Sequence, residues 1–501
     1  MKLTRLSGAL LAAGFLFLSS NVLAAPTNPV GKVNGATVLI KNGFTDEVAK
    51  SVQGPAAKVA ASDMILDLKE ISDEDLVKIV KAFPSVKNFY VESKLLTDIS
   101  PLKNLTVSNG IKIYAEHVKD MTPLLKFTGI KQLYITSKAM ENLKWMTPLT
   151  NLTTAVITGS DKIKSIEGIP AAPKLSNVSL KVMDIADLTP VSALPLTKLD
   201  LTGSQVKDLS PLAANTKLNE LSLYGVTVAD FTPLSKVPAL KRLTVYASKG
   251  ANYDSLGTLA QVEKIDTGMT AMTSLDWVKT AAKLKYLGVF AEAVKDYSPI
   301  KGSSVEALKI WSMRAPVDFA QLKDATNLKQ LIVHGCDQKN AFFNTDAIGS
   351  LTELNSLEVK LWKHCDYVID ASFGKGLKKL NELAIDGINN LVNTEDLKNL
   401  SSVKKVMLKD INPGKTVDLG FLAGMTDLTN MEITGVKVSN FDAIAACSKL
   451  QTLDISKAEG ITSLGALKGI PGLRVLSVKK GAFSDDELKG FASPSLKINQ
   501  K

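Results

Sequence analysis

Short alternations of apolar and polar residues recur along most of the chain. Three examples are Leu221–Leu223, Leu243–Val245 and Leu308–Ile310, each with two apolar residues around one central residue. Successive side chains of a strand point to opposite faces, so both apolar residues of each example point the same way. The pattern predicts many short strands with one apolar face each.

A second block lies between successive alternations. It reads Asp, any residue, Ser or Thr, Pro and then an aliphatic residue, as in Asp208–Leu212, Asp230–Leu234 and Asp296–Ile300. Asp, Ser and Thr cap helical turns, and Pro suits the first position of such a turn. We therefore expect a short helical segment that returns the chain to the next strand.

The spacing of these blocks predicts the fold. Positions equivalent to the Pro occur 18 times between residues 79 and 466, with a mean spacing of about 22.8 residues. This period, with its Leu-x-Leu core, is typical of leucine-rich repeats. The expected fold class is an α/β solenoid, a horseshoe or arc with one long parallel sheet on its concave face. Short helical or 3-10 segments form the convex face, and stacked repeats bury what no single repeat can.

Both ends of the array depart from the repeat, as terminal repeats do. We expect one solenoid of 21 strands, made of 18 repeat strands, two before them and one after them. The predicted regions are an N-terminal cap at 25–78, the repeat array at 79–478 and a C-terminal cap at 479–501. The predicted cap elements are strands at Val38–Ile40, Ile65–Leu68 and Leu496–Ile498, and helices at Thr45–Val52, Asp73–Phe83 and Ser484–Phe491.

Residues 1–24 have the pattern of a secretory signal peptide. Lys2 and Arg5 precede an apolar run from Gly8 to Leu18, and Ala24 suits a cleavage site. The apolar run is too short to span a bilayer as a permanent anchor. We therefore expect export, with the protein in the periplasm, at the cell surface or secreted.

Composition and charge limit the classes of partner that we expect and add nothing about the fold. Apolar residues make up 45% and charged residues 22%, which is ordinary for a globular protein, and the net charge is +10. A basic balance can indicate nucleic acid, but an exported protein seldom meets it. We expect no nucleic-acid partner, no integral membrane segment after cleavage, and a monomer.

The 22-residue period, the Asp-x-Ser/Thr-Pro-Leu block and the Leu-x-Leu strand together resemble the internalin-type bacterial leucine-rich repeat family across residues 79–478. The resemblance implies recognition on the concave face, and host-cell attachment is one role in that family. The family has Asn three residues after the second strand Leu. Here these positions hold Glu116, Lys138, Ser204, Val226, Ser248, Thr270 and Glu292.

Aromatic residues gather on the strand face that points away from the core. Eight of the 54 outward slots are aromatic, about 15%, against 6% in the whole chain. The column directly after Leu-x-Leu contains Tyr224, Tyr246, Phe290, Trp311 and His334, with Gly268 interrupting it. We call these five residues the aromatic ridge.

Two interpretations of the aromatic ridge stay open. Exposed aromatic side chains are favoured anchors for a protein or glycan partner. Aromatics are also good strand formers that stack along a sheet without any partner. In the binding interpretation Tyr286, Arg242 and Lys309 join the ridge as contact residues. Charged neighbours would form its rim, namely Glu220, Lys264, Asp266, Glu358 and Lys360.

Cysteine and histidine gather in two neighbouring repeats. Cys336 follows His334, and Cys365 follows His364. A disulfide between Cys336 and Cys365 suits an oxidising compartment, and it is the interpretation that we favour. The side chains can also be unconnected, or the four residues can hold zinc, although their spacing matches no known finger. Cys447 reads as a buried core residue.

Motifs of catalysis are missing from the sequence. It has no Gly-x-Ser-x-Gly elbow, no His-Glu-x-x-His, no phosphate-binding Gly-rich loop and no Cys-x-x-Cys. We expect no enzyme, no metal and no cofactor. Two functions remain: outward recognition or adhesion through the concave face, or a periplasmic scaffold that binds an endogenous protein, peptidoglycan or polysaccharide.

Overall fold

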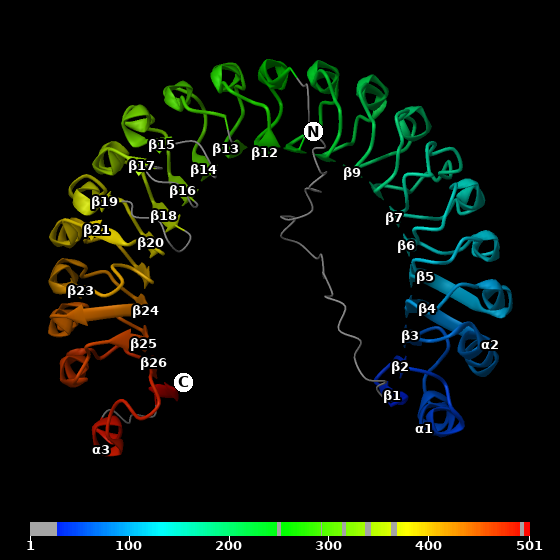
Figure 1. Cartoon of the computed structure of the whole chain (residues 1–501), viewed down its shortest axis with the longest axis horizontal. Coiled ribbons are helices and arrows are strands. Elements are labelled where there is room, and N and C mark those ends of the chain that lie inside the picture. Colours follow the sequence, from blue (N-terminus) through cyan, green and yellow to red (C-terminus); the bar gives the residue numbers. More distant parts are fainter. Residues whose placement is uncertain are drawn as a thin grey trace, which may run out of the picture.

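The chain forms an arc in which a long sheet lines the inner side and short helical segments line the outer side (Figure 1). This computed structural model describes residues 28–247, 252–291, 293–312, 317–335, 342–361, 368–490 and 495–501. Within these residues no helix is long and apolar enough to cross a membrane.

The described residues include 27 strands. Their bounds are β1 Val30–Asn34, β2 Thr37–Lys41, β3 Ile65–Lys69, β4 Ser85–Glu92, β5 Thr106–Tyr114, β6 Gln132–Thr136, β7 Thr154–Thr158, β8 Asn177–Lys181, β9 Lys198–Thr202, β10 Glu220–Tyr224, β11 Arg242–Tyr246, β12 Lys264–Thr270, β13 Tyr286–Ala291, β14 Ala307–Ser312, β15 Val317–Asp318, β16 Gln330–Gly335, β17 Phe342–Phe343, β18 Ser356–Leu361, β19 Val368–Asp370, β20 Glu382–Asp386, β21 Asn390–Val392, β22 Lys405–Lys409, β23 Thr416–Asp418, β24 Asn430–Ser439, β25 Thr452–Glu459, β26 Val475–Val478 and β27 Lys497–Gln500.

Helical segments alternate with the strands. The α-helices are α1 Asp46–Ala56, α2 Asp73–Ala82 and α3 Asp485–Lys489. The 3-10 segments are η1 Ser100–Asn104, η2 Thr122–Leu124, η3 Lys144–Met146, η4 Thr189–Val191, η5 Ser210–Ala214, η6 Thr232–Lys236, η7 Tyr253–Thr258, η8 Asp276–Lys279, η9 Ser298–Ile300, η10 Phe319–Leu322, η11 Thr345–Ser350, η12 Ala371–Lys375, η13 Thr394–Asn399, η14 Gly420–Gly424, η15 Phe441–Ala446 and η16 Gly465–Gly469.

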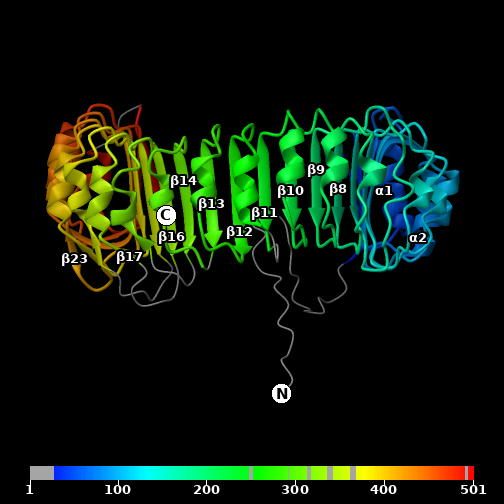
Figure 2. The same ribbon diagram turned by 90° about the horizontal axis from the view of Figure 1, so that it is seen from above.

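One sheet of 23 strands runs through the whole arc, and its repeat strands lie parallel and in register. Figure 2 shows these strands side by side, with helical segments on one face. Leu221 pairs with Leu199 on one side and with Leu243 on the other, so equivalent residues form columns. Leu221 and Leu223 are buried, whereas Ser222 between them faces out. The alternation therefore builds a continuous core, as predicted.

All 21 predicted strands are present, and the prediction missed two further strands of this sheet, β1 and β23. β1 pairs antiparallel with β2 across a tight turn at Gly35, whose φ of 55° favours glycine. The Asn34-Gly35 dipeptide was a hairpin signal that pointed to this strand. β23 is only three residues long and pairs with the extended β24.

The three cap helices begin within one residue of their predicted starts. Ser72 and Asp75 form a capping box at the start of α2, and Thr45 caps α1. α1 extends to Ala56, four residues beyond its predicted end, and includes Pro55 in its last turn. α3 ends at Lys489, and the predicted Phe491 end lies outside the described residues.

The Asp of each block accepts hydrogen bonds at the start of a 3-10 segment, as expected, although in η5 Leu209 rather than Asp208 holds the N-cap position and Pro211 is the second residue of the segment. Asp208 accepts a hydrogen bond from the backbone N–H of Ser210 at 2.8 Å and another from the Ser210 hydroxyl at 2.6 Å. These hydrogen bonds lower the pKa of Asp208, with the hydroxyl contributing most. Each block thereby fixes the start of a 3-10 segment.

Without the family's Asn residues, the turns after the strands are formed in two ways. The hydroxyls of buried Ser93 and Ser137 donate to the carbonyls of Ile71 and Val118 in the preceding repeat. Elsewhere the residue after the ridge column adopts a positive φ, which costs little at Gly225 and more at Val182, whose φ is 55°. Turn geometry therefore varies along the arc.

Candidate binding surface on the concave face

The structure places the aromatic ridge on adjacent strands of the concave face. In strand order the column reads Tyr224, Tyr246, Gly268, Phe290, Trp311, His334 and Lys360. Neighbouring positions are about 4.8 Å apart along the sheet. The predicted column is therefore confirmed as geometry, and Gly268 lies between its two halves.

The first half of the ridge is a pair of stacked phenol rings. The centroids of Tyr224 and Tyr246 are 5.6 Å apart, and their planes differ by 5°. The ring of Tyr246 leans over β12 and occupies the space that a side chain at Gly268 would need. Gly268 is therefore no gap in the ridge, because the neighbouring ring fills it.

Charged groups surround this first half. Lys264 Nζ is 3.9 Å from the ring centroid of Tyr286 and 3.3 Å from the carboxylate of Asp266. Asp266 in turn leans over Gly288 on the next strand. Burial, followed by the charge of Asp266, raises the pKa of Tyr246 to about 12, and the same two causes raise the pKa of Tyr286. The phenols of Tyr246 and Tyr286 therefore stay neutral hydrogen-bond donors at physiological pH.

The second half of the ridge is a chain of hydrogen bonds across three strands. Trp311 Nε1 donates to His334 Nδ1, and His334 Nε2 lies 2.8 Å from Glu358 Oε1. Because Nδ1 accepts, the hydrogen-bond network assigns the imidazole proton to Nε2. The hydrogen bond from His334 is the largest cause of the lowered pKa of Glu358. These contacts fix the orientation of the Trp311 indole.

Phe290 differs from the prediction. It is only 6% exposed, and its ring packs against Trp311 in a T-shaped arrangement with 5.3 Å between the centroids and 76° between the planes. Trp311 therefore covers Phe290, which supports the indole from below rather than offering a surface of its own.

The charged neighbours form ladders between strands. Glu220 lies between Lys198, at 3.2 Å, and Arg242. Asp386 likewise lies between Lys360, at 3.1 Å, and Lys409, at 3.4 Å. Lys309 differs because its Nζ lies 4.5 Å from the Trp311 ring centroid. The ridge is thus flanked by paired charges and by two lysines on aromatic rings, Lys264 and Lys309, of which Lys264 also has a carboxylate partner.

Sequence reasoning missed two features of this surface. Gly268 and Gly288 give room for the side chains of the preceding strand, and Lys309 covers an aromatic ring of its own strand. The signal for the second was present, because residues two apart in a strand share a face. No signal in the sequence showed that the two glycines make room for side chains, because the direction in which a side chain leans depends on its neighbours.

The predicted cysteine site cannot be placed. Cys336, His364 and Cys365 lie outside the described residues, so their disulfide stays a prediction. The described residues contain no group of side chains that could hold a metal ion. Cys447 is buried in the core, as expected, and burial raises the pKa of its thiol to about 11.

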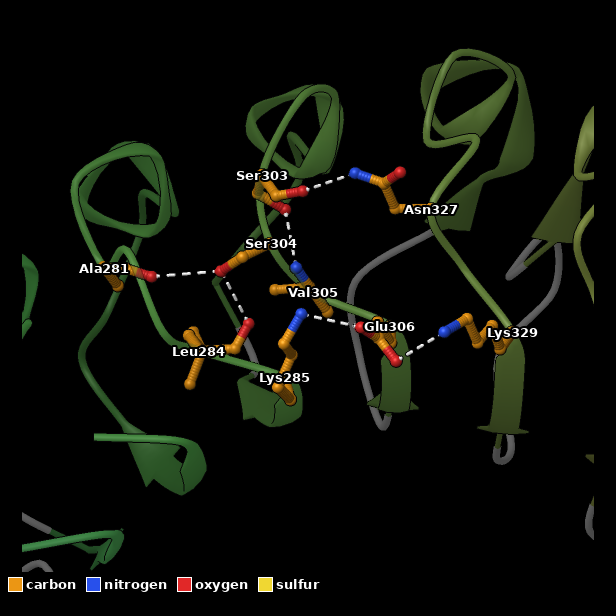
Figure 3. Close-up of polar contacts among 9 residues, drawn as sticks. All are labelled: Ala281, Leu284, Lys285, Ser303, Ser304, Val305, Glu306, Asn327 and Lys329. Carbon is orange, nitrogen blue, oxygen red and sulfur yellow. Dashed lines mark hydrogen bonds and ion pairs between the residues drawn. The ribbon is translucent and has the colours of Figure 1, made fainter. Parts of the chain in front are cut away.

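A hollow of about 610 Å³ lies on the flank where the strands begin. The Glu306 carboxylate bridges Lys285, at 2.6 Å, and Lys329, at 2.8 Å (Figure 3). These two ion-paired hydrogen bonds lower the pKa of Glu306 to about 2. The Ser304 hydroxyl donates to two carbonyls of the preceding repeat, and Asn327 donates to Ser303. The polar groups drawn there bind one another across repeats, so they serve the stacking.

Comparisons with known proteins agree with this architecture. No protein-family model and no curated protein sequence matches the chain. Among solved structures, the TLR13–ssRNA13 complex is 15% identical with a TM-score of 0.55, and the match covers 93% of this chain and 73% of that chain.

Bacterial proteins are also among the matches. An internalin, InlF of Listeria monocytogenes, is 16% identical with a TM-score of 0.37, covering 81% of this chain and 94% of that chain. The leucine-rich repeat protein LIC12759 of Leptospira interrogans is 16% identical with a TM-score of 0.48, covering 85% and 98%. The in-register repeat sheet, together with the match at a TM-score of 0.55, shows that this chain has the leucine-rich repeat fold. Internalins are among the solved proteins that it resembles.

Proposed function

We propose that this chain is an exported, non-enzymatic binding protein that holds a protein partner on its concave face. The observation that carries the proposal is the aromatic ridge, in which the half-buried Tyr224, Tyr246 and Trp311 occupy one column of the concave face, in β10, β11 and β14. Rings of this kind bury a large area on binding and lose little entropy. A surface of this kind suits recognition rather than catalysis.

The fixed geometry of the ridge supports a binding role. Gly268 makes room for Tyr246, and the Trp311–His334–Glu358 chain orients the indole before any partner arrives. Preorganised side chains reduce the entropy that binding must offset. A protein partner fits better than a glycan, because the Trp311 face is already occupied by Lys309 and Tyr246 leans onto the sheet.

The ridge is tested by substitution. A photo-crosslinking residue in place of the half-buried Thr244 first identifies the partner in living cells. The double variant Tyr246→Ala and Trp311→Ala is then expected to bind this partner at least ~10-fold more weakly, with an almost unchanged melting curve. Met407→Ala, an exposed site elsewhere on the concave face, is the matched control. Unchanged affinity in the double variant would remove the ridge from the account.

Location separates outward recognition from the alternative of a periplasmic scaffold with an endogenous partner. We expect the native protein at the cell surface or in the culture supernatant. Antibody detection in periplasmic, surface and supernatant fractions measures this, and protease shaving of intact cells should remove the surface signal. Signal confined to the periplasm would favour the scaffold and an envelope partner.

A further inference from the structure

A second cluster of aromatic and basic side chains lies on the concave face near the N-terminal end of the arc. Lys112 in β5 is flanked by Tyr90 in β4 and Tyr134 in β6, which occupy the same central column. Tyr114, two residues along the same strand, faces the same way. All four residues are half-buried. We call these four residues the N-terminal patch.

The patch repeats a feature of the aromatic ridge. Lys112 Nζ lies 4.6 Å from the ring centroid of Tyr114, and Lys309 Nζ lies 4.5 Å from that of Trp311. Both pairs arise from a central lysine followed two residues later by an aromatic residue. An ammonium on a ring face is held by the ring quadrupole, while its other N–H groups remain directed away from the ring.

Lys112 and Lys309 also differ from the other lysines of the concave face in their ion pairing. In the three outward columns of β3 to β25, the other described cations each have a carboxylate partner. They are Lys69, Lys181, Lys198, Arg242, Lys264, Lys360, Lys405 and Lys409. Among the described residues Lys112 and Lys309 form no ion pair, although the charge of Lys309 contributes to the lowered pKa of Glu358, a carboxylate that His334 already holds. Asp67, the carboxylate nearest to the patch in its column, is already 3.7 Å from Lys69.

We infer that the N-terminal patch is a second contact site for the protein partner, and that both sites take acidic side chains of that partner. A carboxylate can bind each lysine without removing it from its ring, while the tyrosine faces pack on the apolar part of the acidic segment. That the partner is a protein rests on the proposed function. That its contacting residues are acidic follows from charge complementarity with the two lysines.

The distance between the two sites sets the size of a useful probe. β5 and β14 are nine strand-to-strand steps apart, which is about 43 Å along the sheet at about 4.8 Å a step. An extended peptide covers about 3.3 Å per residue. A labelled peptide of about 20 glutamates is therefore long enough to reach both sites.

The experiment measures the binding of this polyglutamate peptide to the full chain by fluorescence anisotropy. We expect Lys112→Gln and Lys309→Gln each to weaken binding at least about fivefold, and Lys112→Arg to retain it. Lys468→Gln, an exposed lysine on the convex side, removes the same charge and is expected to bind as the wild type. Unchanged binding by Lys112→Gln, or equal losses in Lys112→Gln and Lys468→Gln, would overturn the inference.

Two further outcomes separate this inference from the proposed function. If Lys112→Gln binds normally while the Tyr246 and Trp311 double variant loses its partner, the second site is wrong and the ridge stands. If polygalacturonate binds more tightly than polyglutamate at matched charge and length, the ligand is an anionic polysaccharide and the assignment to a protein segment is overturned.

Discussion

At the scale of single residues, two glycines of the concave face leave space for side chains of the preceding strand. Gly268 has no side chain, so Tyr246 lies across it, and Gly288 accommodates Asp266 in the same way. A Cβ at either position would push the neighbouring side chain off the sheet. Gly268 therefore decides the orientation of the Tyr246 ring, and Gly288 that of the Asp266 carboxylate beside it.

Gly268→Ala tests this arrangement. The added methyl displaces the Tyr246 ring and separates it from Tyr224, so partner affinity is expected to fall about 5- to 10-fold with a small loss of stability. Gly129→Ala is the control, because its added Cβ would meet no atom within 4 Å. Binding curves and thermal melts of both variants check the expectation, and equal affinities would contradict it.

At the scale of elements, the C-terminal third contains pairs of repeats that the sequence did not reveal. Asn344, Asn393 and Asn440 all have a left-handed backbone before a 3-10 segment, and each donates to an Asp of the preceding repeat. In the pair that contains Asn393, the accepting Asp370 also caps its own 3-10 segment. These two-repeat units are joined by short outer strands such as β19 and β21.

Asn393 separates two contributions to such a pair. Asn393→Ala is expected to lower the free energy of unfolding by ~2 kcal/mol, because it loses the bond to Asp370 and strains the left-handed backbone. Asn393→Gly relieves the strain and is expected to lose only ~1 kcal/mol. Urea denaturation distinguishes them, and a larger loss for the Gly variant would contradict this account.

The Asp caps make the repeats sensitive to acid. Asp120, Asp187, Asp208 and Asp230 have pKa values lowered by hydrogen bonds from Thr or Ser two residues later. A depressed pKa in the folded state stabilises the fold above the unfolded pKa of about 3.9, and this stabilisation is lost as the pH falls through the folded value. Below about pH 4 the melting temperature is therefore expected to fall, and less steeply in Asp208→Asn. Parallel curves for the variant and wild type would contradict the cap's role.

At the scale of the whole molecule, each repeat contacts only its neighbours, so stability is local. Leu223 is fully buried between β9 and β11. Leu223→Ala is expected to cost ~3 kcal/mol and to increase amide exchange first in β9 to β11. Hydrogen exchange followed by mass spectrometry measures this, with Met407→Ala as an exposed control. A uniform increase along the arc would indicate that the solenoid unfolds as one unit.

The sequence by itself determined the repeat, its register and the column of the aromatic ridge. Alternating apolar residues at a fixed period leave a parallel stack as the one arrangement that buries them all. The same argument located 21 strands and put Tyr224, Tyr246 and Trp311 on one face.

Tertiary structure alone decided how those side chains lie. It buried Phe290 against Trp311, laid Tyr246 over Gly268, and left Lys112 and Lys309 on rings without an ion pair among the described residues. It also paired the C-terminal repeats through Asp and Asn. These outcomes depend on the side chains of adjacent repeats, which lie about 22 residues apart in the sequence and about 4.8 Å apart in the sheet. Periodicity fixes which residues become neighbours, and packing between those neighbours decides their orientation.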